Sequence, residues 1–149
     1  MEYEIVMVEE KWVSGPQIRT ENKDGRAVRD IAALWEDFFR TAKNEQVHAT
    51  VDSAVLGVYT DYESDEAAPY SYLAGCEVDS DARTEFPVRK IAAGKYAKYT
   101  AAGDMEKAVG EIWQAVWNAP YKRSYTSDFE EYIDMGTGNA TLNIYIGIE

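Results

Sequence analysis

Two segments of the chain carry apolar residues at three- and four-residue spacing, which is typical of amphipathic helices. The first extends from Arg26 to Lys43, and the second begins at Gly103-Asp104 and ends at Asn118-Ala119-Pro120. Asp104 suits the N-cap of the second helix, and Pro120 stops it. The two apolar stripes consist of Ile31, Leu34, Trp35, Phe38, Phe39 and Ala42, and of Met105, Val109, Ile112, Trp113, Val116 and Trp117.

Shorter apolar runs before and after each helix predict β-strands. The polar segment Gln17–Gly25 is expected to be irregular, and the strand within Phe86–Thr100 to be kinked near Gly94. The acidic stretch Asp61–Glu66 and the turn Gly136–Asn139 are expected to connect neighbouring strands. The predicted strands lie within residues 4–9, 55–62, 70–78, 86–100, 125–133 and 141–148.

The two halves share an order of elements and an aromatic signature. Leu34-Trp35 followed by Phe38-Phe39 is matched by Ile112-Trp113 followed by Val116-Trp117. Each half then predicts strand, helix, strand, strand, with half-repeats of about 1–80 and 81–149 in a single domain. Pairing two such units buries the sheet face and the helix stripe that each would expose alone. We therefore expect an α+β fold with a pseudo-twofold axis, an antiparallel-rich sheet, and both helices on one face with a cleft between them.

Composition narrows the class of protein. The 149 residues suffice for one domain with a sizeable core. No run approaches the ~18 apolar residues of a membrane span, and Met1–Glu4 lacks the basic start of a signal peptide. A cytoplasmic location without a membrane partner is expected. Cys76 alone excludes an internal disulfide, and with His48 it is too little for a Cys/His metal site, so no metal or cofactor is expected.

The charge balance disfavours nucleic acid as a direct partner. The net charge is −12, from 27 acidic and 15 basic residues, and the basic residues are scattered rather than gathered in a stripe. An acidic balance favours cationic ligands or basic partners. Eleven Tyr and four Trp are enough to line a pocket beyond those needed in the core.

Glu130 is the strongest candidate for a binding residue. In a strand over Phe129-Glu130-Glu131-Tyr132, side chains alternate, so Glu130 and Tyr132 share one face and Glu131 takes the other. One glutamate must then face the helices, where tyrosine hydroxyls could donate to it and a cationic ligand could neutralise it. The alternative, with similar weight, is that both glutamates face solvent at a strand edge.

Aromatic residues near this carboxylate form the second part of the candidate site. Those facing the cleft could stack on a planar ligand or meet a cation face-on, which is worth roughly 2 kcal/mol when desolvated. Core packing is the alternative for each of them, and we expect it for at least half of the helix pairs. The candidates are Trp35, Phe39, Trp113 and Trp117 on the helices and Tyr59, Tyr62, Tyr72, Tyr96 and Tyr132 on the strands.

Several short motifs, in this order and spacing, resemble the GyrI-like small-molecule-binding domain, the effector-binding domain of AraC-type and MerR-type transcription activators. The resemblance covers nearly the whole chain. The motifs are Leu34-Trp35, Val55–Tyr62, Tyr72–Gly75, Ile91–Tyr96, Gly103, Ile112-Trp113, Phe129–Tyr132 and Asn143–Ile146.

The resemblance implies a duplicated strand-helix-strand-strand fold with a ligand cleft between the helices. It also implies that Glu130 is the buried acid that recognises lipophilic cations such as drugs or dyes. This chain begins at its first strand, without the helix-turn-helix of the regulators, so a free-standing domain is expected, acting alone or with a DNA-binding partner in trans. Lys98 lies on the same strand face as Tyr96, where the family tends to be apolar. The resemblance therefore does not fix the polarity of this part of the pocket wall.

Three functions follow, in order of preference. The first is binding of lipophilic cations, as a sensor or sequestering protein. The second is hydrolysis of reactive electrophilic compounds, with Glu130 as general base, since some GyrI-like proteins resemble such hydrolases. The third is a protein-interaction module like the gyrase inhibitors that gave the family its name, with an acidic surface mimicking nucleic acid.

Overall fold

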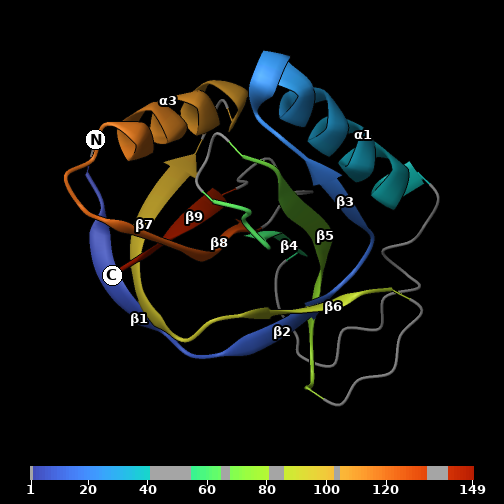
Figure 1. Ribbon diagram of the computed structural model, residues 1–149, viewed down its shortest axis with the longest axis horizontal. Coiled ribbons are helices and arrows are strands. Elements are labelled where there is room, and N and C mark those ends of the chain that lie inside the picture. The colour runs from blue at the N-terminus through green and yellow to red at the C-terminus, as the bar shows by residue number, and fades with distance from the viewer. Residues whose placement is uncertain (1, 41–54, 65–67, 81–85, 103–104, 134–140) are drawn as a thin grey trace.

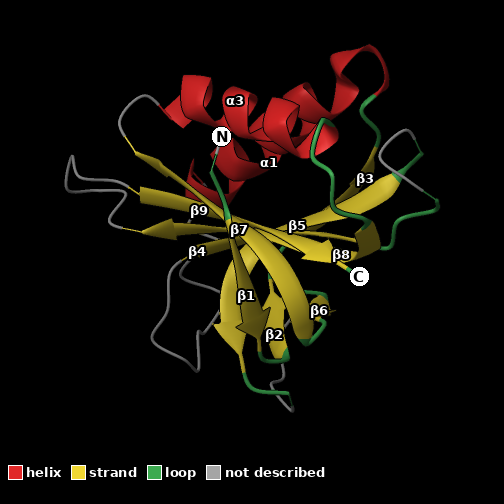
Figure 2. Cartoon of the chain, turned by 90° about the vertical axis from the view of Figure 1, so that its left-hand side faces the viewer, coloured by secondary structure: helices red, strands yellow, loops and turns green. Residues whose placement is uncertain are grey.

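The computed structural model describes residues 2–40, 55–64, 68–80, 86–102, 105–133 and 141–149. Two helices pack on one face of an antiparallel sheet of nine strands in this described part, which confirms the predicted α+β fold (Figure 2). The helices are α1 (Arg26–Arg40) and α3 (Met105–Trp117), with a 3-10 turn, η1 (Lys23–Gly25), before α1. The strands are β1 (Glu4–Val8), β2 (Lys11–Ser14), β3 (Gln17–Thr20), β4 (Val55–Thr60), β5 (Tyr70–Val78), β6 (Val88–Ile91), β7 (Gly94–Ala102), β8 (Arg123–Ile133) and β9 (Thr141–Ile148).

The pairing of the strands confirms the predicted duplication. The first unit is β3, α1, β4 and β5, and the second is β7, α3, β8 and β9. In each unit the last strand pairs with the first and the second strands, so β5 lies between β3 and β4 while β9 lies between β7 and β8. The two units join where β4 pairs with β8, which places Gly57 opposite Glu130 at the centre of the sheet.

The prediction that Gln17–Gly25 is irregular was wrong. Gln17–Thr20 forms β3, the first strand of the first unit, and Lys23–Gly25 forms η1. This strand lacks an apolar run, and its polar side chains are instead held by hydrogen bonds: Arg19 donates to Ser71 Oγ at 3.1 Å and Thr20 to Asp30 at 2.8 Å. The strand predicted within Glu4–Glu9 is β1, which pairs with β7 of the other unit.

A two-stranded ribbon crosses the side of the sheet opposite the helices. β1 continues into β2 and β6 into β7, with Val8 opposite Gly94 and Lys11 opposite Ile91 (Figure 1). The predicted kink near Gly94 is confirmed, because the strand is interrupted between β6 and β7, and Gly94, the first residue of β7, has φ 150°. The ribbon therefore bends under the sheet and reaches both of its sides.

Alternating side chains of the central strands build a core on each face of the sheet. One core faces the ribbon and contains Leu56, Val58, Leu73 and Phe129, all buried. The other faces α1 and α3, and its members include Phe38, Tyr59, Tyr70, Tyr72 and Ala74 on one side and Ala97, Tyr99, Ile112, Leu142, Ile144 and Ile146 on the other.

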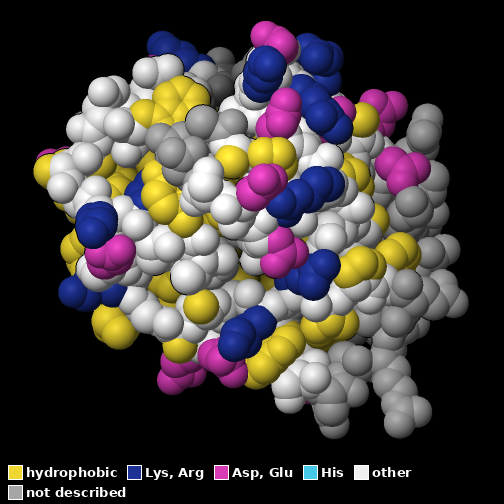
Figure 3. Space-filling view, viewed as in Figure 1, with side chains coloured by type: hydrophobic (Ala, Val, Ile, Leu, Met, Phe, Trp, Pro, Cys, Tyr) yellow, Lys and Arg dark blue, Asp and Glu magenta, His cyan; other side chains and the backbone are white. Residues whose placement is uncertain are grey.

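The outward faces of the helices differ in polarity. Charged side chains of both signs gather over α1, whereas hydrophobic and uncharged atoms are more frequent over α3 (Figure 3). Val28 of α1 and Trp117 of α3 are large apolar residues that remain 76% and 50% exposed. Within the described residues, neither helix is long and apolar enough to span a membrane.

Candidate functional site

A cavity of about 590 Å³ lies between α1 and α3 and above the central strands. Its walls come from both helices and its floor from strands of both units, as expected for a cleft between duplicated halves. The lining residues are Asn22, Ala27, Val28, Ile31, Ala32, Tyr59, Tyr62, Tyr70, Val109, Gly110, Trp113, Gln114, Trp117, Arg123, Glu130, Tyr132 and Leu142.

Glu130 lies at the floor of this cavity and is only 3% exposed. Its Oε1 accepts a hydrogen bond from the Tyr59 hydroxyl at 2.7 Å. Its Oε2 accepts from Tyr132 at 2.7 Å and from Tyr72 at 3.1 Å. Glu131 takes the opposite face, where it accepts a bond from Asn143. Of the two orientations that the sequence left open, the inward-facing one is therefore correct for Glu130.

A missing side chain opposite Glu130 makes room for this cluster of hydroxyls. Gly57 of β4 pairs with Glu130 across the ladder. A Cβ atom at Gly57 would lie 2.1 Å from the Tyr72 hydroxyl and 3.1 Å from Glu130 Oε2. The first contact is closer than packed atoms allow and the second is tighter than most Cβ contacts, so Tyr72 can reach Glu130 in this position only across a glycine.

Trp35 supports the cluster from α1 and does not line the cavity. Its indole Nε1 donates to the Tyr72 hydroxyl at 2.7 Å, which fixes the orientation of that hydroxyl toward Glu130. Its ring also packs edge-on against Tyr132, with the ring centroids 5.2 Å apart. Trp35 and Tyr72, both predicted as ligand contacts, therefore lie behind the cavity lining.

Burial and hydrogen bonding act in opposite directions on the Glu130 carboxyl. Burial raises its pKa, while the hydrogen bonds from Tyr59, Tyr132 and Tyr72 partly offset that rise. Burial, followed by the nearby Glu130 charge, raises the pKa of Tyr59 and Tyr72 well above 10, so both stay protonated donors. Among the described residues, the groups bonded to Glu130 are neutral hydroxyls, and no cationic side chain pairs with it.

The other predicted aromatic residues divide between the cavity and the core. Tyr59, Tyr132, Trp113 and Trp117 line the cavity, with Trp113 5.4 Å from Tyr59 and 6.5 Å from Trp117 between ring centroids. The side chain of Phe39 lies outside the described residues.

The structure places Tyr96 away from the cavity, on the ribbon side of the sheet. Its ring centroid is 5.5 Å from that of Phe129 and its hydroxyl donates to the Ala92 carbonyl at 2.6 Å. Lys98 shares this face, pairing with Glu4 at 3.9 Å, so it does not alter the pocket wall. The alternation along β7 explains the difference, because it is Ala97 that faces α3.

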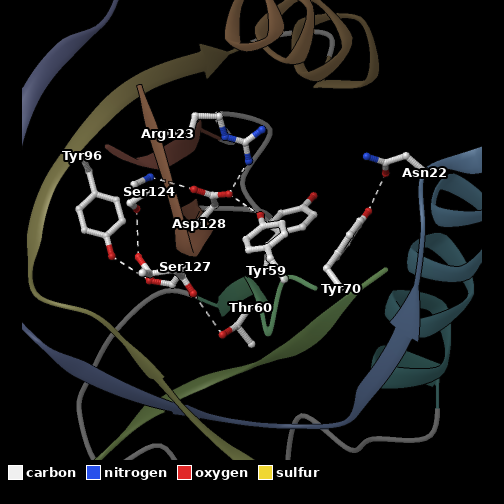
Figure 4. Close-up of polar contacts among 12 residues, drawn as sticks. Asn22, Tyr59, Thr60, Tyr70, Tyr96, Arg123, Ser124, Ser127 and Asp128 are labelled. Atoms are coloured by element: carbon white, nitrogen blue, oxygen red, sulfur yellow. Dashed lines mark hydrogen bonds and ion pairs between the residues drawn. The ribbon is translucent and has the colours of Figure 1, made fainter. Parts of the chain in front are cut away.

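A second buried polar cluster at one end of the cavity was not predicted from the sequence. Arg123 Nη2 pairs with Asp128 Oδ2 at 2.7 Å, and their side chains are 7% and 1% exposed. The Tyr62 hydroxyl also donates to Asp128 Oδ2, and the Gly147 N–H donates to Oδ1 at 2.8 Å. Figure 4 shows Arg123 directed toward Asp128.

Aromatic rings surround the Arg123 guanidinium. Its Cζ lies 4.5 Å from the centroid of Tyr125 and 6.0 Å from those of Tyr62 and Trp113, distances typical of cation–π contacts. Burial alone would lower the pKa of Arg123, but the adjacent Asp128 carboxylate, together with Tyr62 and Tyr125, outweighs this and the pKa is raised. The guanidinium therefore remains charged at the cavity wall.

The backbone of β8 explains why sequence periodicity missed this pair. Residues five apart in a regular strand point to opposite faces, so Arg123 and Asp128 would not meet. The register of β8 against β9 shifts between these two residues, and Tyr125 has φ 54° in the left-handed region. This irregularity turns Arg123 to the face of Asp128.

Comparisons with known proteins agree with this fold. The chain matches the family model of Cass2, an integron-associated effector binding protein, over residues 4–148. The integron cassette protein VCH_CASS2 of Vibrio cholerae is 32% identical, with a TM-score of 0.76 over 99% of this chain and 95% of that one. No protein of curated function matches the chain.

Two further solved structures share the fold at lower identity. SAV2435, in a structure with bound tetraphenylphosphonium, is 22% identical, with a TM-score of 0.78 over 100% of this chain and 94% of that one. The C-terminal domain of EcmrR is 16% identical, with a TM-score of 0.55 over 100% and 99%. The family match and the Vibrio relative confirm the resemblance found in the sequence, and the chain belongs to the Cass2 family of integron-associated effector-binding proteins, which are GyrI-like small-molecule-binding domains.

Proposed function

We propose that this protein binds lipophilic cations in the cavity between α1 and α3, with Glu130 as their counter-ion. The observation that carries this proposal is the Glu130 carboxylate, which is 3% exposed at the floor of an apolar cavity and, within the described part of the chain, is bonded only to hydroxyls. Ionising such a group without a cation costs several kcal/mol of desolvation. A bound cation offsets that cost through Coulomb attraction in a site of low dielectric.

The aromatic walls favour a cation with apolar substituents. Tyr59, Trp113 and Trp117 line the cavity and present ring surfaces on which a cation or a planar group can pack. The SAV2435 structure with a lipophilic phosphonium supports this choice of ligand class. A protein of this kind would act as a sensor or would sequester its ligand, and a sensor could pass its signal to a DNA-binding partner in trans.

The hydrogen bonds of Glu130 suit an anion better than a general base. Three phenol hydroxyls occupy lone pairs on both carboxylate oxygens, and each favours the ionised form. A base that accepts a proton from water would weaken these bonds as it reacted, because a neutral carboxyl group is a poorer acceptor than a carboxylate. This pattern favours ligand binding over the hydrolase that the sequence left open.

Titration with tetraphenylphosphonium tests the proposal, with tryptophan fluorescence or calorimetry as the readout. We expect Glu130→Gln to weaken binding by at least about tenfold, because it removes the counter-ion while keeping the side-chain volume. Glu131→Gln is the matched control, since it removes the same charge one residue away on the opposite face. That control should change the affinity by less than about twofold, because its charge is screened by solvent and distance.

A neutral aromatic compound, triphenylphosphine oxide, separates charge from shape. Its binding should be weaker than that of the phosphonium and insensitive to Glu130→Gln. Equal phosphonium affinity in wild type and Glu130→Gln would remove the role assigned to the carboxylate, and absence of saturable binding would remove the proposal itself.

A further inference from the structure

Two carboxylates project from the helix-facing side of β8. Asp128 and Glu130 are two residues apart, so they point to the same face with their Cα atoms roughly 7 Å apart along the strand. Both are almost fully buried, at 1% and 3% exposure. If both were ionised without a cationic partner, the two carboxylates would give the site a charge of −2, which burial and mutual repulsion oppose.

The structure compensates these two carboxylates differently. Asp128 pairs with the Arg123 guanidinium at 2.7 Å and accepts further bonds from Tyr62 and the Gly147 N–H. Glu130 accepts bonds from three hydroxyls, which are neutral. One of the two negative charges is thus balanced within the protein, and the other is left for a ligand.

We infer that Arg123 determines the valence of the ligand: by neutralising Asp128 it leaves a single uncompensated negative charge in the cavity, so the site selects monocations over dications. This inference rests on the proposed function and adds a ligand class to it. Arg123 lines the cavity, whereas Asp128 lies behind it, so a ligand meets the guanidinium at that end.

Among the described residues that line this cavity, a dication would find no second counter-ion. Its first charge would pair with Glu130, and its second would lie near the guanidinium in a poorly hydrated site, where like charges repel strongly. Asp128 cannot serve as a partner while Arg123 holds it. A monocation avoids this repulsion and keeps its remaining surface against the aromatic walls.

The packing around Arg123 holds the guanidinium in place. The Tyr125 ring lies 4.5 Å from its Cζ, and the Tyr62 and Trp113 rings flank it at 6.0 Å. With its side chain 7% exposed, the guanidinium would have to leave its aromatic contacts and its carboxylate partner to make way for a ligand. Selection by valence is therefore built into the folded protein.

The experiment compares two triphenylphosphonium ions that differ in one atom. One carries a propyl arm ending in trimethylammonium and is a dication, and the other carries the same arm ending in tert-butyl and is a monocation. Both are permanently charged, so pH does not alter their valence. The measured quantity is the ratio of the two dissociation constants, compared between variants, which cancels the difference in arm hydrophobicity.

In wild type we expect the monocation to bind more tightly. Arg123→Met keeps an apolar side chain of similar length but exposes the second carboxylate charge, so the ratio should shift toward the dication by at least about tenfold. Asp128→Asn has the opposite effect on charge, since it leaves the guanidinium to offset Glu130, and it should weaken monocation binding. The double variant Arg123→Met/Asp128→Asn returns the site to one net negative charge and should restore the wild-type ratio.

This restoration separates a charge effect from a structural one, because a merely structural role for Arg123 would not be rescued by a second substitution. If Arg123→Met does not fold, as judged by circular dichroism, Asp128→Asn and the double variant carry the same comparison. A ratio unchanged by these substitutions, while the monocation still needs Glu130, overturns the role of Arg123 and leaves the proposed function standing. Loss of all phosphonium binding in wild type overturns both.

Discussion

At the residue scale, the site depends on how a buried carboxylate is kept ready to ionise. The pKa of Glu130 is raised by burial above its ordinary value of 4.5, and the three tyrosine hydroxyls limit that rise. The neutral form is therefore favoured in the empty protein at acidic pH, whereas a bound cation favours the ionised form. Protonation and cation binding compete for the same oxygen atoms.

We predict that the affinity for tetraphenylphosphonium falls as the pH is lowered through the raised pKa of Glu130. Tyr132→Phe removes a donor to the ionised form, so it should move this transition to higher pH. Glu130→Gln should bind weakly at every pH. Calorimetric titration from acidic to neutral pH checks the prediction, and a wild-type affinity that does not vary with pH would contradict it.

The same shift predicts how folding depends on pH. Because the folded-state pKa of Glu130 lies above the unfolded one, its stabilising contribution is fully present below the unfolded pKa and is lost as the pH rises through the folded pKa. We therefore expect the free energy of unfolding of Glu130→Gln, measured with denaturant, to increase relative to that of wild type as the pH rises from acidic to neutral. Parallel curves would count against this assignment.

At the element scale, two glycines show how strand and helix differ in what they tolerate. Gly57 of β4 faces the Tyr72 hydroxyl, whereas a Cβ at Gly110 of α3 would meet nothing within 4 Å, although Gly110 lines the cavity. The site therefore requires a glycine at position 57 of β4, whereas the packing of α3 does not require one at position 110.

We predict opposite effects of alanine at these positions. Gly57→Ala should destabilise the protein by about 1–3 kcal/mol through overpacking and weaken cation binding by displacing Tyr72. Gly110→Ala, the matched control, should stabilise it by about 0.5–1 kcal/mol, because alanine favours a helix interior. Denaturant unfolding measures both, and a Gly57→Ala variant as stable as wild type would contradict the tight fit.

Elements with a clear period were predictable, and those whose side chains find polar partners were not. Apolar spacing predicted α1 and α3, and alternation narrowed Glu130 to two orientations without choosing between them. Strand β3 was missed because its polar side chains are satisfied by distant residues such as Ser71 and Asp30. Arg123 was missed because a local irregularity in β8 breaks the alternation on which strand predictions rely.

At the scale of the whole molecule, the cavity lies at the seam between the two units. Residues of α1 and β4 come from one unit, and residues of α3 and β8 from the other. The ligand we propose would contact both units at once. Its binding free energy would then stabilise the association of the two helices as well as the pocket itself.

We predict that saturating tetraphenylphosphonium slows amide hydrogen exchange in α1 and α3 together. A ligand that binds only the folded state suppresses every opening that breaks its site. Mass spectrometry of the two helices, with Glu130→Gln as the control that should show little change, measures this. Protection confined to one helix would place the ligand outside the seam.

The ribbon beneath the sheet has a consequence for how the duplicated halves depend on each other. Strand β1 of the first half pairs with β7 of the second half, and β6 of the second half pairs with β2 of the first. Each half therefore supplies a strand that covers a strand edge of the other. The two halves are thus interlocked through these strands, although each contains a full strand-helix-strand-strand unit. Separating the halves would leave strand edges of both unpaired, so we expect the two halves to unfold together as one cooperative unit.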